Sequence, residues 1–127
     1  MVQGVERRKF PRAYFTVSDS IFAVFELPEP EKFSMSTNVL SLSEGGISFI
    51  GQKEALESLK AGDQILLVRI FEPEDLHFLH NIRLQVRHTI NEPGMEHVLV
   101  GCRFLDPSEE QKTGISKFVN NWLNRSK

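Results

Sequence analysis

Apolar and polar residues alternate along two stretches late in the chain, a pattern typical of β-strands with one solvated face. In the first stretch the apolar side carries Ile82, Leu84, Val86, His88 and Ile90. In the second it carries Val98, Val100, Cys102 and Phe104. The turn residues 91–94 separate the two stretches, so the sequence predicts an antiparallel hairpin.

Four other apolar runs predict further strands, which makes six in all. They cover residues 21–27, 33–42, 47–50 and 64–71. Between the second and third runs, Gly45 and Gly46 predict a tight turn, because glycine adopts a positive φ without steric cost. Residues 53–62 predict one irregular helical turn and a loop.

The pattern changes at Asp106, where a helix is expected over about residues 107–125. Asp106 is the predicted cap, Pro107 takes the first helical position, and Glu109 follows three residues after the cap. One apolar stripe then follows: Ile115, Phe118, Val119, Trp122 and Leu123. Since this stripe must be buried, we expect an all-β fold, a six-stranded barrel with the C-terminal α-helix packed on it.

The composition fits one globular domain of 127 residues, with 40% hydrophobic and 25% charged residues. No apolar run approaches the roughly 20 residues of a membrane helix, and the N-terminus lacks a secretory signal. A single cysteine, Cys102, cannot form an internal disulfide. These features favour a cytoplasmic location.

The charge is distributed unevenly along the chain. Residues 1–12 carry four cationic side chains against Glu6, about +3, although the total is −2. We expect a flexible basic N-terminal arm over residues 1–12 and a single barrel domain over residues 13–127. An acidic body is a poor partner for a long nucleic acid. The arm suits a small phosphate-bearing anion, or is simply a solvated tail.

Catalytic and metal-binding patterns are scarce, so the sequence predicts neither an enzyme nor a metal site. His77 and His80 have a spacing found among metal ligands, but they stand alone on an acidic surface. By strand parity, His88 is expected in the core with its hydrogen bonds satisfied. Cys102 is expected to be an inert buried thiol, because no base accompanies it.

Two short segments offer binding chemistry. In the first, Arg8 and Arg12 bracket a stiff Phe-Pro step. Guanidinium groups bind phosphate or the guanine O6/N7 edge through two bonds and also stack on purines. In the second, Ser41 and Ser43 point to one side of a strand, and Gly46 allows a ligand to approach the backbone.

Together the two segments resemble the signatures of PilZ domains. Arg8 and Arg12 match Arg-x-x-x-Arg, and Arg7 gives the double-arginine form. The second signature, Asp/Asn-x-Ser-x-x-Gly, aligns with Ser41, Ser43 and Gly46. Residues 101–106 before the last helix also resemble the family's order of elements, so the resemblance runs from about residue 6 to residue 123.

The resemblance implies a six-stranded antiparallel (split) barrel that binds the bacterial second messenger cyclic di-GMP without catalysis or a cofactor. Arg8 and Arg12 would hold its phosphates and guanine edges, and Ser43 and Gly46 would line the guanine pocket. Arg7 would permit binding of a stacked ligand dimer. The arm would close over the ligand and signal to an unidentified partner protein, with no nucleic-acid polymer and no membrane insertion.

One departure from the signature keeps an alternative open. Ser41 replaces Asp or Asn and satisfies the guanine edge less fully, which predicts weaker binding. The alternative function is therefore a PilZ-like adaptor that acts through protein contacts without the nucleotide. A nucleic-acid-binding barrel lacks spaced aromatic residues on a strand face, and an enzyme lacks a plausible acid, base and nucleophile.

Overall fold

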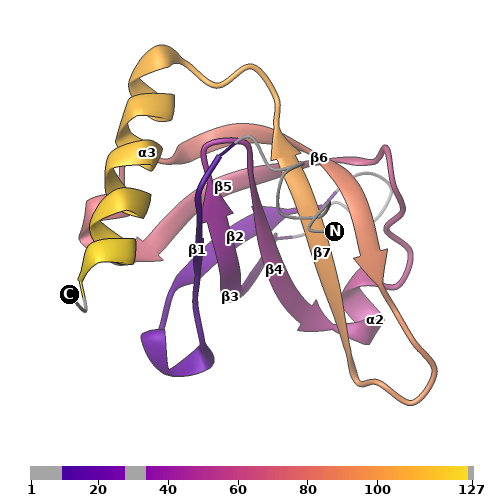
Figure 1. Ribbon diagram of the computed structural model, residues 1–127. Coiled ribbons are helices and arrows are strands. Elements are labelled where there is room, and N and C mark those ends of the chain that lie inside the picture. Colours follow the sequence, from indigo (N-terminus) through magenta and orange to yellow (C-terminus); the bar gives the residue numbers. More distant parts are fainter. Residues whose placement is uncertain (1–9, 28–33, 126–127) are drawn as a thin grey trace, which may run out of the picture.

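The computed structural model describes residues 10–27 and 34–125 (Figure 1). The strands are β1 (Arg12–Tyr14), β2 (Phe22–Glu26), β3 (Ser34–Ser43), β4 (Gly46–Gln52), β5 (Gln64–Glu72), β6 (His80–Ile90) and β7 (His97–Phe104). The helical elements are η1 (Val17–Asp19), α2 (Lys53–Leu56), η2 (Glu74–Leu76) and α3 (Glu109–Asn124). The strand-rich architecture expected from the apolar pattern is confirmed.

Six of the strands close into an antiparallel barrel. The neighbours run β3, β2, β5, β6, β7 and β4, and β4 pairs with β3 again. The short β1 pairs with residues 41–43 of β3, on the edge where β2 pairs with residues 34–38. The six-stranded barrel with a C-terminal helix is therefore confirmed. We did not predict β1, because three residues are too few to show a period of two.

The barrel interior is a continuous apolar core. Phe25 of β2 and Phe49 of β4 are fully buried and stack with ring centroids 4.0 Å apart. In the β6–β7 hairpin, Ile82, Leu84 and Val86 point into the core, as their alternation predicted. Burial of such side chains contributes about 1.5–3 kcal/mol each and makes the barrel a rigid support for its surface loops.

The N-cap of helix α3 lies two residues later than predicted. Ser108 is the N-cap: its Oγ accepts from the Gln111 amide at 3.1 Å, and Gln111 Oε1 accepts from the Ser108 amide at 2.8 Å. Asp106 has φ 50° and lies outside the helix, so its assignment as the cap was wrong. Within the described ranges, no helix is both long enough and apolar enough to cross a bilayer.

The apolar face of α3 packs against β1 and against Phe15, the residue that follows it. Ile115 and Val119 are buried, whereas Leu123 is 45% exposed and lies beyond the contact. The rings of Trp122 and Phe15 pack edge to face with their centroids 4.9 Å apart, and Trp122 Nε1 donates to the Tyr14 carbonyl at 3.2 Å. In Figure 1, α3 stands beside β1. The C-terminal helix therefore holds β1 against the barrel.

The thiol of Cys102 is buried in β7, as its strand parity predicted. Desolvation by burial raises the pKa of this thiol from 9.0 to about 12. A thiol with so high a pKa stays protonated at neutral pH, and the thiolate is the reactive form. Cys102 is therefore a packing residue.

The raised pKa of Cys102 predicts a loss of stability in alkali. Below about pH 9 the thiol is protonated in both folded and unfolded chains; above that pH, and up to about pH 12, only the unfolded chain releases the proton. The free energy of unfolding should therefore fall, by about 1.4 kcal/mol per pH unit from this thiol. Urea unfolding of the wild type and of Cys102→Ala across this range isolates the effect. An equally steep decline in Cys102→Ala would contradict the assignment.

Candidate functional site

The turn between β3 and β4 is held by one hydroxyl group. Ser43 Oγ accepts from the amides of Gly45 and Gly46 at 3.2 and 3.3 Å. The expectation of positive φ at these glycines was wrong: the glycines with positive φ in the described chain are Gly62 and Gly94. Gly46 is needed for space, since a Cβ there would lie 2.1 Å from the Cys102 carbonyl oxygen.

Ser41 has a hydroxyl partner that the sequence analysis did not identify. Its Oγ lies 2.5 Å from Ser48 Oγ on β4, and its side chain is only 3% exposed. The two serines meet because residues 41 and 48 are opposite each other in the β3–β4 register. One hydrogen-bonding capacity of each hydroxyl is thereby used within the protein, and the remainder is available to a ligand.

Arg12 lies directly across the sheet from this turn. In the β1–β3 register it pairs with Ser43, although the two residues are far apart in sequence. Its Nε is buried and has no hydrogen-bond partner among the described residues. A buried unsatisfied donor costs about 1–3 kcal/mol, which an anionic ligand would remove. Phe10 packs on the same turn: a Cβ at Gly45 would lie 3.2 Å from its ring.

A cavity of about 610 Å³ opens at this turn, a size suited to a small molecule. Its lining includes Arg12, Arg87 and Arg103, and we call it the arginine cavity. No carboxylate lines it within the described chain. Arg103 is oriented by a 2.8 Å bond from its Nε to Gln85 Oε1. Three guanidinium groups without a carboxylate favour an anion.

His88 lies in this cavity rather than in the core, so its assignment by strand parity was wrong. Val86 pairs with Cys102 and His88 with Gly101, which leaves Arg87 as an additional residue in β6. Such a β-bulge shifts the alternation by one position. His88 and Ile90 are exposed as a result, whereas Val86 is buried. The alternation of apolar residues continues unchanged through the bulge. The sequence therefore could not show that Arg87 and His88 line the cavity.

The predicted ligand residues that the structure describes lie in one place. The arginine cavity is lined by Arg12, Ser41, Ser43 and Gly46. Arg7 and Arg8, with most of the predicted arm, lie outside the described residues. The cavity lining also contains residues that were not predicted: Phe10, Ser48, Arg87, His88, Gly101 and Arg103. The ligand-binding role of the predicted residues remains a prediction.

A second hollow, of about 540 Å³, lies between the β3–β4 turn and α3. Its charges are mixed, because Lys112 and Lys117 stand beside Glu44 and Glu109. The Lys112 ammonium already pairs with the Glu109 carboxylate at 3.2 Å. This hollow has less excess positive charge than the arginine cavity, which is therefore the better candidate for an anionic ligand.

Metal-ligating groups do not gather anywhere in residues 10–27 and 34–125: no three His, Cys, Asp or Glu side chains are placed to share an ion. His77 Nε2 instead lies 2.7 Å from the Phe71 carbonyl oxygen, within hydrogen-bond distance. His77 is thus bonded to the neighbouring end of β5, and His80 is exposed to solvent.

Comparison with known proteins gives a family match and a fold match. The model of the PilZ domain matches residues 6–121. Among solved structures, the Bacillus subtilis inhibitor of motility MotI/DgrA is 19% identical, with a TM-score of 0.69 over 95% of this chain and 53% of that one. A comparison with curated proteins gives no significant match.

Two further similar structures contain a nucleotide. The K. pneumonia MrkH–c-di-GMP complex is 16% identical, with a TM-score of 0.71 over 94% of this chain and 54% of MrkH. The PilZ domain of YcgR from Escherichia coli, solved with c-di-GMP, is 12% identical, with a TM-score of 0.69 and 94% coverage of both chains. The chain spans about half the length of the MotI/DgrA and MrkH chains. At these identities the likeness shows the fold.

The two glycines of the turn should respond differently to a methyl group. Gly46→Ala forces a Cβ into the Cys102 carbonyl and should lower the free energy of unfolding by about 1–3 kcal/mol. A Cβ in Gly45→Ala lies 3.2 Å from the Phe10 ring, which can shift, and 3.8 Å from Ser43 Oγ, an ordinary contact, so we expect a change of about 0.5 kcal/mol or less. Urea unfolding monitored by circular dichroism measures both. Equal effects would show that the turn does not depend on this close approach.

Proposed function

The chain belongs to the PilZ domain family, and from that premise we propose that it is a non-catalytic receptor for cyclic di-GMP. One observation carries the proposal: Arg12 and Ser43, from the family's two signature segments, are directly paired across β1 and β3 at the arginine cavity. The c-di-GMP complexes of MrkH and YcgR, which share the fold, support the choice of ligand.

Arg12 would contribute most among the described residues. Its guanidinium offers a planar set of donors for a phosphate or for guanine O6 and N7. Its buried Nε is a donor that has no hydrogen-bond partner among the described residues. Arg7 and Arg8 would complete the cationic set from the N-terminal arm, with Arg7 admitting a stacked ligand dimer.

The β3–β4 turn would form the opposite side of the nucleotide pocket. Ser43 Oγ accepts two backbone amides, and so its hydroxyl proton is the group left to donate to the ligand. Gly46 would act by keeping this turn close to β7, since the space that a side chain would occupy is filled by the Cys102 carbonyl. Ser41 and Ser48 share one hydrogen bond and would offer the ligand their remaining capacity.

Signalling would follow from closure of the basic arm onto the barrel. The ligand would favour the closed arm only to the extent that it binds that state more tightly. The new surface would then be recognised by a partner protein, in the cytoplasm, without a nucleic-acid polymer, membrane insertion or a cofactor. Of the predicted arm, residues 1–12, Arg12 is already paired with Ser43 in β1, so the residues before it would move. Residues 13–127 would form the barrel that supports them.

One observation favours a second function, that of an adaptor without the nucleotide. Ser41 stands where the family signature has Asp or Asn, and it is buried and already bonded to Ser48. A site with this pair presents fewer free acceptors to a guanine edge. The same barrel could then act through protein contacts alone.

Calorimetric titration with cyclic di-GMP distinguishes the two functions. The receptor predicts saturable heat with a micromolar or lower Kd. Arg12→Ala and Arg8→Ala should each weaken binding by about 10- to 100-fold, since a hydrogen bond to a charged group contributes about 1.5–3 kcal/mol. Arg69→Ala is the control, because the Arg69 guanidinium stacks on Phe71 and does not line the cavity.

The outcome for the wild type decides between receptor and adaptor. A flat titration with a folded wild-type protein would overturn the receptor and leave the adaptor. Equal affinities for the wild type and Arg12→Ala would place the ligand outside the arginine cavity.

A further inference from the structure

The bulge in β6 gives the arginine cavity a second wall. The alternating apolar residues of β6 up to Val86 point inward and are buried. After Val86, the additional residue Arg87 shifts the alternation, so that His88 points outward. Both Arg87 and His88 are exposed and line the cavity. Arg12 and Ser43 line the same cavity from β1 and β3. A ligand between these strands would therefore contact β6 as well as the signature segments.

The ring of His88 occupies space that a glycine leaves free. A Cβ at Gly101 would lie 2.4 Å from His88 Cε1 and 2.7 Å from its Nε2. Any other residue at 101 would displace the ring. Within the described chain, neither ring nitrogen of His88 has a hydrogen-bond partner. The described residues thus provide a place for the imidazole but no polar partner for it.

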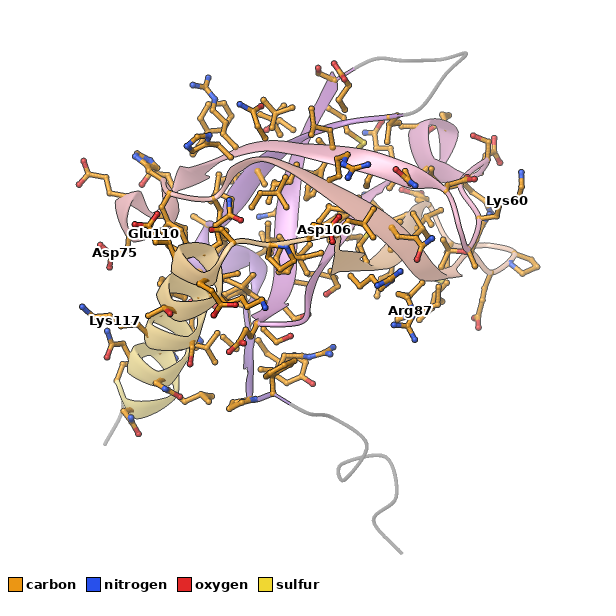
Figure 2. The ribbon with its side chains drawn as sticks, turned by 90° about the horizontal axis from the view of Figure 1, so that it is seen from above. Lys60, Asp75, Arg87, Asp106, Glu110 and Lys117 are labelled. Carbon is orange, nitrogen blue, oxygen red and sulfur yellow. The ribbon has the colours of Figure 1, made fainter. Side chains whose placement is uncertain are left out.

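Arg87, on the same wall, has no ion-pair partner in residues 10–27 and 34–125. No described carboxylate forms an ion pair with it; Arg83, also on β6, lies 3.7 Å from Asp106. In Figure 2, Arg87 lies well apart from Glu110 and Lys117 on α3. Its guanidinium is available to an anion in the cavity and is not engaged by the helix.

We propose that Arg87 and His88 form a third ligand-binding segment, in which the His88 ring stacks on a purine base and Arg87 binds a phosphate. The inference rests on the proposed function and adds residues that neither signature segment contains. Aromatic side chains bind bases through their π-faces, and a ring placed in advance loses little freedom on stacking. A guanidinium opposite Arg12 would place positive charge on both sides of a ligand that carries two phosphates.

Substitutions at His88 separate stacking from hydrogen bonding. In titrations with cyclic di-GMP, His88→Ala should weaken binding by about 5- to 100-fold. His88→Phe keeps a ring and should stay within about threefold of the wild type, whereas His88→Gln keeps a polar group and should behave like His88→Ala. His80→Ala, at the exposed start of the same strand, is the control and should match the wild type.

Substitution of Arg87 tests the phosphate contact. Arg87→Gln should weaken binding and reduce the dependence of the affinity on salt concentration, because one cation fewer neutralises the ligand. Arg83→Gln removes an equal charge from β6 outside the cavity lining and should leave both quantities unchanged. Thermal unfolding of each variant verifies that it is folded.

A spectroscopic change would report the stacking directly. The His88 Cε1 proton of the wild type should shift upfield when cyclic di-GMP is added, because a stacked base shields it. A merely structural role of His88 would leave this resonance in place.

The outcomes for this inference and for the proposed function differ. If Arg12→Ala weakens binding while His88→Ala and Arg87→Gln match the wild type, the proposal of a third ligand-binding segment is wrong. The proposed receptor function would then remain supported. If His88→Gln binds normally and His88→Phe does not, the ring hydrogen-bonds and the stacking is wrong. If the folded wild type does not bind cyclic di-GMP, both proposals fall.

Discussion

The contact between the backbone of Gly46 and the carbonyl of Cys102 is the constraint on which the site depends. It brings β4 and β7 together at the point where the barrel closes, with no room for a side chain. The β3–β4 turn is fixed at the same point, since the Gly45 carbonyl accepts from the Phe104 amide at 3.2 Å. Ser43, at the root of this turn, is thereby held beside Arg12. The contacts that join β4 to β7 therefore also hold the cavity residues in place.

The C-terminal helix α3 also helps to position Arg12. Strand β1 has only three residues and pairs with β3 alone. Trp122 bonds to the Tyr14 carbonyl and packs on Phe15, so α3 supports the strand that carries Arg12. The helix thus stabilises the cavity without lining it.

The sequence predicted what depends on local pattern and missed what depends on register. The hairpin, the barrel and the helix follow from periods of two and 3.6 residues. Arg12, Ser43 and Gly46 were predicted as ligand residues from their chemistry and from the resemblance to PilZ domains. His88 was placed in the core because a one-residue bulge changes no residue type. Ser48 was missed because its partnership with Ser41 is set by cross-strand pairing. Arg7 and Arg8 lie outside the described residues, and their role stays a prediction.

Mapping of backbone amide shifts in ¹⁵N-labelled protein during titration with cyclic di-GMP tests the central claim most directly, because it locates the ligand on the barrel. The account predicts that the largest changes fall on residues 43–46 of the β3–β4 turn and on residues 87–88 and 101 of the β6–β7 hairpin. Shift changes confined to α3, or to the face of the barrel away from the arginine cavity, would contradict it.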